Sequence, residues 1–170
     1  SLALTLYGEL DISVLKDKPA GRLPIKTKVV SPVNRDRLYQ DIRGEIEAGR
    51  QVFVVCPIIE IRDKSQEVRG AAVEDVYAEL QKKQLNGCEV GLLHGKMKPT
   101  EKDAVMQAFI RHELDVLVAT TVIEVGVDVP NASIMVIESA ERFGLAQLHQ
   151  LRGRVGRGSL QSQCYLLLSD

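Results

Sequence analysis

Short apolar runs alternate with segments of helical periodicity along most of this chain of 170 residues, and this alternation limits the fold most strongly. The run at 52–59 is rich in β-branched and other apolar residues at adjacent positions. Such a run is typical of a strand that is buried on both faces of a parallel sheet. Strands that alternate with helices of about 10–15 residues predict βαβ units. Right-handed crossovers then predict an α/β fold of three layers, with a doubly wound, mainly parallel sheet covered by helices on both faces.

The expected elements follow this alternation along the chain. Strands are predicted at 25–30, 52–59, 90–93, 116–119, 134–137 and 164–168. Helices are predicted at 36–48, 73–80, 100–110 and 145–151. The run from Thr100 to Asp103 resembles a capping box that opens the third helix, with Phe109 and Ile110 facing inward.

The beginning of the chain differs from the rest in composition. A polar stretch that contains Pro19 and Gly21 predicts an extended arm over residues 1–24, followed by one domain over residues 25–170. Because the first residue is Ser1 and not methionine, we expect the chain to be a piece of a longer protein. The longest apolar run has eight residues. A helix that spans a membrane needs roughly 18, so no membrane partner is expected.

Charge is distributed unevenly along the chain. Lysine and arginine number 22 against 23 acidic residues, so the net charge of −1 argues against nucleic-acid binding by bulk positive charge. Residues 142–169 nevertheless contain no acidic residue, while they include Arg142, Arg152, Arg154 and Arg157. Guanidinium groups pair bidentately with phosphate, so these glycine-spaced arginines predict a phosphate-directed patch. The alternative is a solvated basic face, which would normally carry lysine and glutamate as well.

Polar residues also follow the strand predicted at 116–119. Thr120 and Thr121 come directly after it, and Gly126 and Asp128 lie a few residues further on. Ligands of doubly wound sheets bind at the carboxyl ends of the strands, where hydroxyl and backbone N–H groups suit phosphate oxygens. Gly126 allows a close approach of the backbone to a partner, and the Asp128 carboxylate suits a ribose or an arginine. The alternative is a strand end that is closed by an ordinary turn.

His94 and Gly95 follow the strand predicted at 90–93 in the same way. A lone histidine at such a place is more often a structural residue than a catalytic one. No serine or cysteine nucleophile motif accompanies it, so the sequence gives no support to a hydrolase triad. Of the three candidate binding segments, the one with His94 and Gly95 is therefore weaker than the arginine patch and the segment that begins at Thr120.

Other common sites are absent from the sequence. The three cysteines, Cys56, Cys88 and Cys164, have no C-x-x-C spacing, which favours buried free thiols over a zinc site. There is no G-x-x-x-x-G-K-[ST] phosphate loop, and the glycines at 153–158 do not match the G-x-G-x-x-G fingerprint. The chain therefore lacks the usual phosphate cradle, and no metal ligand is expected.

Together these segments resemble the motifs of superfamily 2 helicases. The run Thr120-Thr-x-x-Glu-x-Gly-x-Asp-x-Pro130 is similar to the fifth motif, and Gln150-x-x-Gly-Arg-x-x-Arg157 is similar to the sixth. Longer strings, such as Gly91-Leu-Leu-His-Gly-Lys-Met-Lys-Pro99, resemble the RecG family of bacterial ATP-dependent DNA helicases. The transcription-repair coupling factors share the run from Ala146 to Arg157, but the opening Tyr7-Gly-Glu-Leu-Asp11 favours the RecG family.

The resemblance implies the second RecA-like motor domain of a helicase or translocase. Such an enzyme remodels branched DNA, including replication forks and Holliday junctions, during DNA repair and recombination. It is expected in the bacterial cytoplasm, at the nucleoid. ATP with Mg²⁺ is expected to be bound mainly by the preceding motor domain of the same protein, to which the arm at 1–24 connects. The chain alone is therefore not expected to hydrolyse ATP.

Motif position also implies roles for single residues. Arg157 is implied as the arginine finger, with Arg154 and Gln150 as the other catalytic residues. Nucleotide binding is assigned to Asp128, Gly126, Arg154 and Arg157, and DNA binding to Thr120, Thr121, His94 and Gly95. Two alternatives remain: the motor domain of a transcription-repair coupling factor, and a nucleotide-binding module without catalysis. Tight binding of ATP by the chain alone would favour the module.

Overall fold

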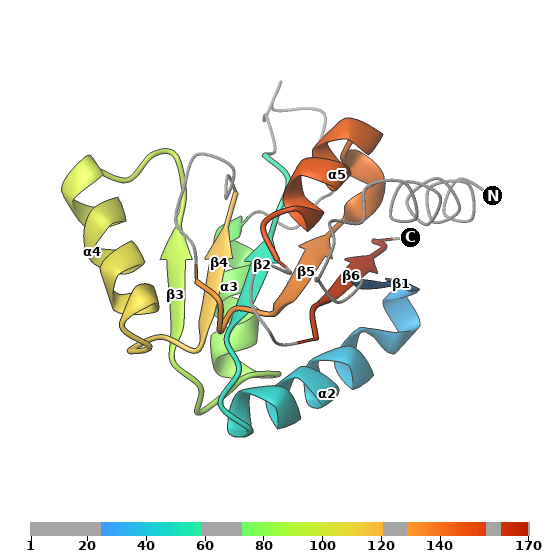
Figure 1. Cartoon of the computed structure of the whole chain (residues 1–170), viewed down its shortest axis with the longest axis horizontal. Helices are drawn as coiled ribbons and strands as arrows, with labels where there is room; N and C mark the ends of the chain where they lie inside the picture. The colour runs from blue at the N-terminus through green and yellow to red at the C-terminus, as the bar shows by residue number, and fades with distance from the viewer. Residues whose placement is uncertain (1–24, 59–72, 121–128, 156–160, 170) are drawn as a thin grey trace.

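Parallel strands form one six-stranded sheet in the order β1-β6-β5-β2-β4-β3. The computed structural model describes residues 25–58, 73–120, 129–155 and 161–169, and the structural statements below concern these residues. The arrows of the central strands point the same way (Figure 1). The strands are β1 (Lys26–Val30), β2 (Val52–Val55), β3 (Val90–Leu93), β4 (Val116–Ala119), β5 (Ile134–Glu138) and β6 (Gln163–Leu167).

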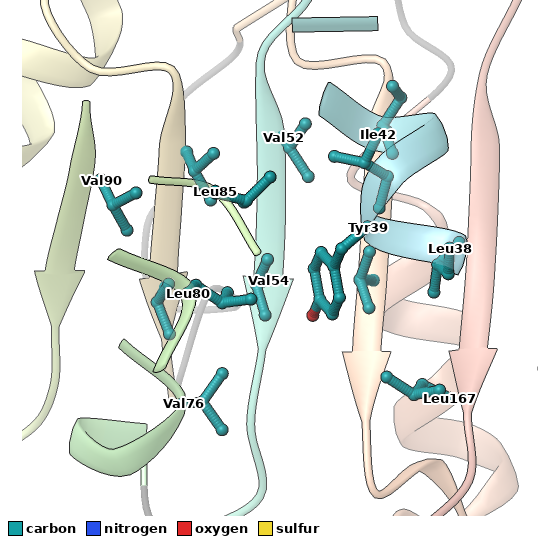
Figure 2. Close-up of a cluster of buried hydrophobic side chains, with 14 of the residues drawn as sticks. Leu38, Tyr39, Ile42, Val52, Val54, Val76, Leu80, Leu85, Val90 and Leu167 are labelled. Atoms are coloured by element: carbon teal, nitrogen blue, oxygen red, sulfur yellow. The ribbon is translucent and has the colours of Figure 1, made fainter. Parts of the chain in front are cut away.

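Helices cover both faces of the sheet. They are α2 (Arg35–Glu47), α3 (Val73–Lys82), α4 (Pro99–Ile110) and α5 (Leu145–Arg152), with short 3-10 helices η1 (Pro32–Asn34) and η2 (Ala140–Arg142). Val54 of β2 packs against α2 and α3, and Figure 2 shows it between Tyr39 and Leu80. The next residue along the strand, Val55, belongs to a second core, together with Phe109 of α4 and Leu148 of α5. Alternate residues of a strand point to opposite faces, so one sheet supports two cores. The predicted three-layer, doubly wound fold is confirmed.

Three local predictions were wrong. The strand at 52–59 ends at Val55, and residues 56–58 continue outside the sheet. The third helix begins at Pro99 with Lys98 as its N-cap, and no capping hydrogen bond from a side chain is present there. Proline at the first helical position has a fixed φ and needs no hydrogen-bond acceptor, so the helix starts before Thr100. Ile110, predicted to face inward, is 39% exposed.

The two edges of the sheet differ in what they carry. Because the pairing is parallel, the carboxyl ends of the described strands all lie at one edge of the sheet, which we call the carboxyl edge. The chain returns to the opposite, amino edge through turns that contain Gly49 (φ 99°) and Gly87 (φ 94°). These left-handed conformations favour glycine because a Cβ atom would be strained there. The expected arm at 1–24 lies outside the described residues, and no described helix is long and apolar enough to span a membrane.

We expect burial of Cys164 to make the fold less stable at alkaline pH. Burial raises the pKa of this thiol to about 12, although the charge of Arg152 opposes the shift. Above about pH 9 the unfolded thiol loses its proton while the folded thiol keeps it, so the free energy of unfolding falls as pH rises toward 12. The slope is about 1.4 kcal/mol per pH unit. Between pH 9 and 12, the free energy of unfolding of Cys164→Ala, measured by denaturant unfolding, should fall less steeply with pH than that of the wild type. Equal slopes in the two proteins would contradict this account.

Candidate functional site at the carboxyl edge of the sheet

Hydrogen bonds between neighbouring strand ends bring separate segments together at the carboxyl edge. The N–H of Thr120, directly after β4, donates to the carbonyl of Leu93 at the end of β3 (3.3 Å). The N–H of Cys56, directly after β2, donates to the carbonyl of Ala119 at the end of β4 (2.8 Å). The chain segments that leave β3, β4 and β2 therefore start side by side, although they are far apart in the sequence.

His94 is held by its own turn. Its Nδ1 accepts a hydrogen bond from the N–H of Lys96 (3.2 Å), and its Nε2 lies 3.7 Å from a carboxylate oxygen of Glu74 on α3. Its side chain is 18% exposed. Both ring nitrogens face groups of the protein, so the geometry favours the structural interpretation of this histidine.

Gly95 is the most open of the predicted DNA contacts that lie among the described residues. Gly95 is exposed, and a Cβ atom added there would meet no other atom within 4 Å. Thr120 is half-buried and sits beside the start of this turn. The structure thus brings His94, Gly95 and Thr120 to one place, while Thr121 lies outside the described residues.

Helix α5 and the turn after it hold the described part of the sixth motif, residues 150–155. Its N-terminus is closed by the N–H of Gly144, which donates to Oε1 of Gln147 (3.0 Å). Leu148 is fully buried in the core, whereas Gln150 is exposed. Arg154 follows in the turn that ends the helix and is half-buried, with its N–H donating to the carbonyl of Leu151 (3.0 Å). Packing of α5 on the core therefore leaves Gln150 at the surface and fixes the backbone at Arg154.

The predicted arginine patch is smaller than the sequence indicated. Arg142 is exposed, but Arg152 is only 5% exposed and belongs to the interior. The reason is helical spacing: residue 152 lies one turn after Leu148 and shares its buried face. Arg157, Gly126 and Asp128 lie outside the described residues, so their roles rest on the sequence alone.

A partly buried ion-pair network that the sequence did not predict lies where β5 ends. Nη1 of Arg35 contacts both carboxylate oxygens of Glu138 (2.6 and 2.5 Å), and the hydroxyl of Tyr39 donates to the same carboxylate (2.6 Å). Nη2 of Arg35 also pairs with Glu79 of α3 (3.1 Å). The only signal was an acidic residue at the end of an apolar strand, and 103 residues separate Arg35 from Glu138.

Burial and the charges of the network shift the pKa values of Arg35, Tyr39 and Cys56. Burial, and then the charge of Glu138, raise the pKa of the Tyr39 hydroxyl well above its ordinary value. Burial alone would lower the pKa of Arg35, but Glu138, Tyr39 and Glu79 together outweigh this effect, and the pKa is raised. Burial, followed by Glu138, also raises the pKa of the Cys56 thiol. Arg35 therefore stays charged, and Tyr39 and Cys56 stay protonated, near neutral pH. We infer that the role of the network is structural.

Comparison with known proteins agrees with this architecture. The family model described as helicase conserved C-terminal domain matches residues 34–159. The chain is 51% identical over 170 residues to the ATP-dependent DNA helicase RecG of Synechocystis, covering all of this chain and 20% of that protein. It is 48% identical over 169 residues to RecG of Staphylococcus epidermidis, covering 99% of this chain and 24% of that protein. The chain therefore spans about a fifth to a quarter of the length of these relatives.

A solved structure extends the likeness to three dimensions. The structure of RecG bound to a three-way DNA junction matches with a TM-score of 0.71 and 45% sequence identity, over 89% of this chain and 19% of that one. The parallel sheet and its helices thus have the RecA-like arrangement of helicase C-terminal domains. The chain belongs to the helicase conserved C-terminal domain family, and the relatives it matches are RecG helicases.

Proposed function

We propose that the chain is the second motor domain of an ATP-dependent helicase that remodels branched DNA in the bacterial nucleoid. The observation that carries the proposal is the position of α5, which packs through Leu148 and leaves Gln150 at the surface, with Arg154 in the next turn. The chain has arginines suited to phosphate but no phosphate loop. Such a domain completes a nucleotide site that another domain begins. Similarity to RecG bound to a three-way junction supports branched DNA as the substrate.

The described donors fit a nucleotide polyphosphate. Gln150 offers an amide and Arg154 a guanidinium, and no acidic residue is present from 142 to 169. ATP, bound with Mg²⁺ mainly by the preceding motor domain, supplies the free energy of its hydrolysis. Arg154 and Arg157 approach the γ-phosphate, where a guanidinium stabilises the charge of the transition state. Gly126 and Asp128 shape the nucleotide side of the interface.

DNA binding uses the carboxyl edge in this proposal. Thr120 and Thr121 offer hydroxyl groups, and Gly95 offers an open backbone, to DNA phosphates. His94 contributes by holding the turn that contains Gly95, because its Nδ1 accepts the N–H of Lys96. Contacts of this kind position the protein on DNA and read no base sequence.

The first test is ATP turnover by the full-length protein that contains this chain. A replication fork should stimulate turnover more strongly than linear duplex DNA of the same length, whereas the isolated chain should show none. Equal stimulation by both DNAs would remove branched DNA as the substrate. Turnover that depends on RNA polymerase, and not on a fork, would favour the coupling-factor alternative. Tight ATP binding by the isolated chain would favour a nucleotide-binding module without catalysis.

A further inference from the structure

Two residues other than glycine have a positive φ in the part of the chain that the structure describes, Ser139 (φ 49°) and His112 (φ 61°). Ser139 comes directly after β5, at the carboxyl edge, and is 5% exposed. Its ψ of 51° places it in the left-handed helical region. A residue with a Cβ atom rarely adopts this conformation, because the Cβ atom lies too close to the following carbonyl oxygen. Such backbone strain persists only where the surrounding structure enforces it.

Contacts on both sides of Ser139 enforce its conformation. On the side before it, Glu138 is fixed by the guanidinium of Arg35 and by the hydroxyl of Tyr39. On the side after it, the carbonyl of Ser139 accepts the backbone N–H of Arg142 (2.9 Å), which closes the short helix η2. The ion-pair network therefore anchors the end of β5, and the chain leaves the strand direction at the next residue.

The turn at Ser139 leads into the helix that carries the start of the sixth motif. Residues 140–144 form the whole connection between Ser139 and α5, and η2 occupies the first three of them. Phe143, which follows η2, packs on the same core as Leu148 of α5. A different backbone conformation at Ser139 would therefore displace both η2 and the start of α5. Because Gln150 and Arg154 follow on α5 and in the next turn, they would be displaced as well.

We propose that Ser139 is a positioning residue for the sixth motif: its left-handed turn, anchored by Glu138, sets where α5 holds Gln150 and Arg154 against the nucleotide. The inference rests on the proposed function and deepens it, because it adds a residue that acts on the nucleotide site without touching the nucleotide. Groups that act in a reaction must be held within a narrow range of their productive geometry. The backbone conformation of Ser139 supplies this constraint, and its hydroxyl takes no part in the reaction.

Substitutions at Ser139 in the full-length protein test the proposal. Ser139→Val should lower the kcat of fork-stimulated ATP turnover by about 100-fold, the scale for a misplacement of about 1 Å in a reaction site. The physical reason is that a β-branched residue is an outlier at positive φ, so the turn must change. The KM for ATP should change less than kcat, since in the proposed function the preceding motor domain supplies most of the nucleotide site. Ser139→Gly should retain turnover, because glycine adopts the left-handed conformation without strain.

His112→Val is the matched control. His112 has the same left-handed conformation, but it is exposed and lies after α4, at the amino edge. Valine imposes a similar backbone strain at the two positions, so denaturant unfolding should show a loss of stability in both variants. Only Ser139→Val should lose turnover. Equal turnover in the two folded valine variants would overturn the proposal.

A second pair of variants decides the question if Ser139→Val does not fold. Tyr39→Phe removes one hydroxyl donor from the Glu138 carboxylate and keeps the ring beside the Arg35 guanidinium (5.2 Å to the ring centroid). It should lower kcat by about 2- to 30-fold, the range for residues that couple two sites without touching either ligand. Tyr165→Phe, which removes a hydroxyl from β6, is the control and should leave kcat unchanged. A kcat of Tyr39→Phe equal to that of Tyr165→Phe would refute the anchoring of the turn.

The outcomes separate this inference from the proposed function. If a fork does not stimulate turnover by the wild-type protein, the proposed function fails. If it does, and the folded Ser139→Val keeps the kcat of the wild type, the positioning role alone is refuted. A loss of turnover in Ser139→Gly as large as that in Ser139→Val would also refute it, because the site would then require the hydroxyl of Ser139 and not its conformation.

Discussion

Arg157→Ala is expected to reduce the DNA-stimulated ATP turnover of the full-length protein by about 10³–10⁵-fold. A guanidinium supplied across a domain interface stabilises charge that develops on the γ-phosphate during transfer. At about 1.4 kcal/mol per tenfold change, this is roughly 4–7 kcal/mol of transition-state stabilisation. Steady-state turnover with saturating fork DNA measures the effect. ATP binding should persist, because in the proposed function a preceding motor domain supplies most of the site.

Two further variants make this prediction specific. Arg157→Lys should also fail, because an ammonium group lacks the planar fork that pairs bidentately with phosphate. Arg111→Ala, which removes the same side chain at an exposed position after α4, should retain turnover. Turnover of Arg157→Ala close to wild type would overturn the assignment of the finger without contradicting the proposed motor function.

Glu138→Ala is expected to destabilise the chain by about 3 kcal/mol, the lower end of the range for breaking a buried ion pair. The substitution leaves the Arg35 guanidinium near the interior without its main partner and removes the acceptor of the Tyr39 hydroxyl. The lower end applies because the side chain of Arg35 retains 21% exposure. Denaturant unfolding followed by circular dichroism gives the change in the free energy of unfolding.

Other positions of the network provide the controls. Glu79→Ala removes the outer partner of Arg35. Because the side chain of Glu79 is 37% exposed, this variant should lose less than about 1 kcal/mol of the free energy of unfolding. The double variant Arg35→Met with Glu138→Leu should be more stable than Glu138→Ala, because no uncompensated charge remains in the interior. A loss in Glu138→Ala as small as that in Glu79→Ala would show that Glu138 is not the centre of the network.

The fold could be predicted because its signals are local and repeated. The apolar runs at 90–93 and 116–119 coincide with β3 and β4, since strands buried on both faces must be apolar throughout. The prediction was wrong where one residue decides the local geometry. Pro99 moved the start of α4 ahead of Thr100, and the facing of α5 turned Arg152 inward. Composition gives the number of arginines but not the face of the helix on which each one lies.

The candidate site, too, could be predicted only in part from the sequence. Parallel topology predicts that residues after β3 and β4 meet, and His94 and Thr120 do lie side by side. Sequence spacing could not reveal that Arg35 pairs with Glu138, since the pair forms only when β5 and α2 have packed.

The amino edge of the sheet offers a practical route to testing the proposed motor function. The turn at Asn86 and Gly87 is exposed there, and the candidate DNA contacts follow the strand ends at the opposite edge. A fluorophore attached through a cysteine in place of Asn86 would therefore sit away from the DNA contacts. Energy transfer from this position to a labelled fork would test the proposed movement of the domain along DNA, with the fluorophore outside the proposed DNA contacts.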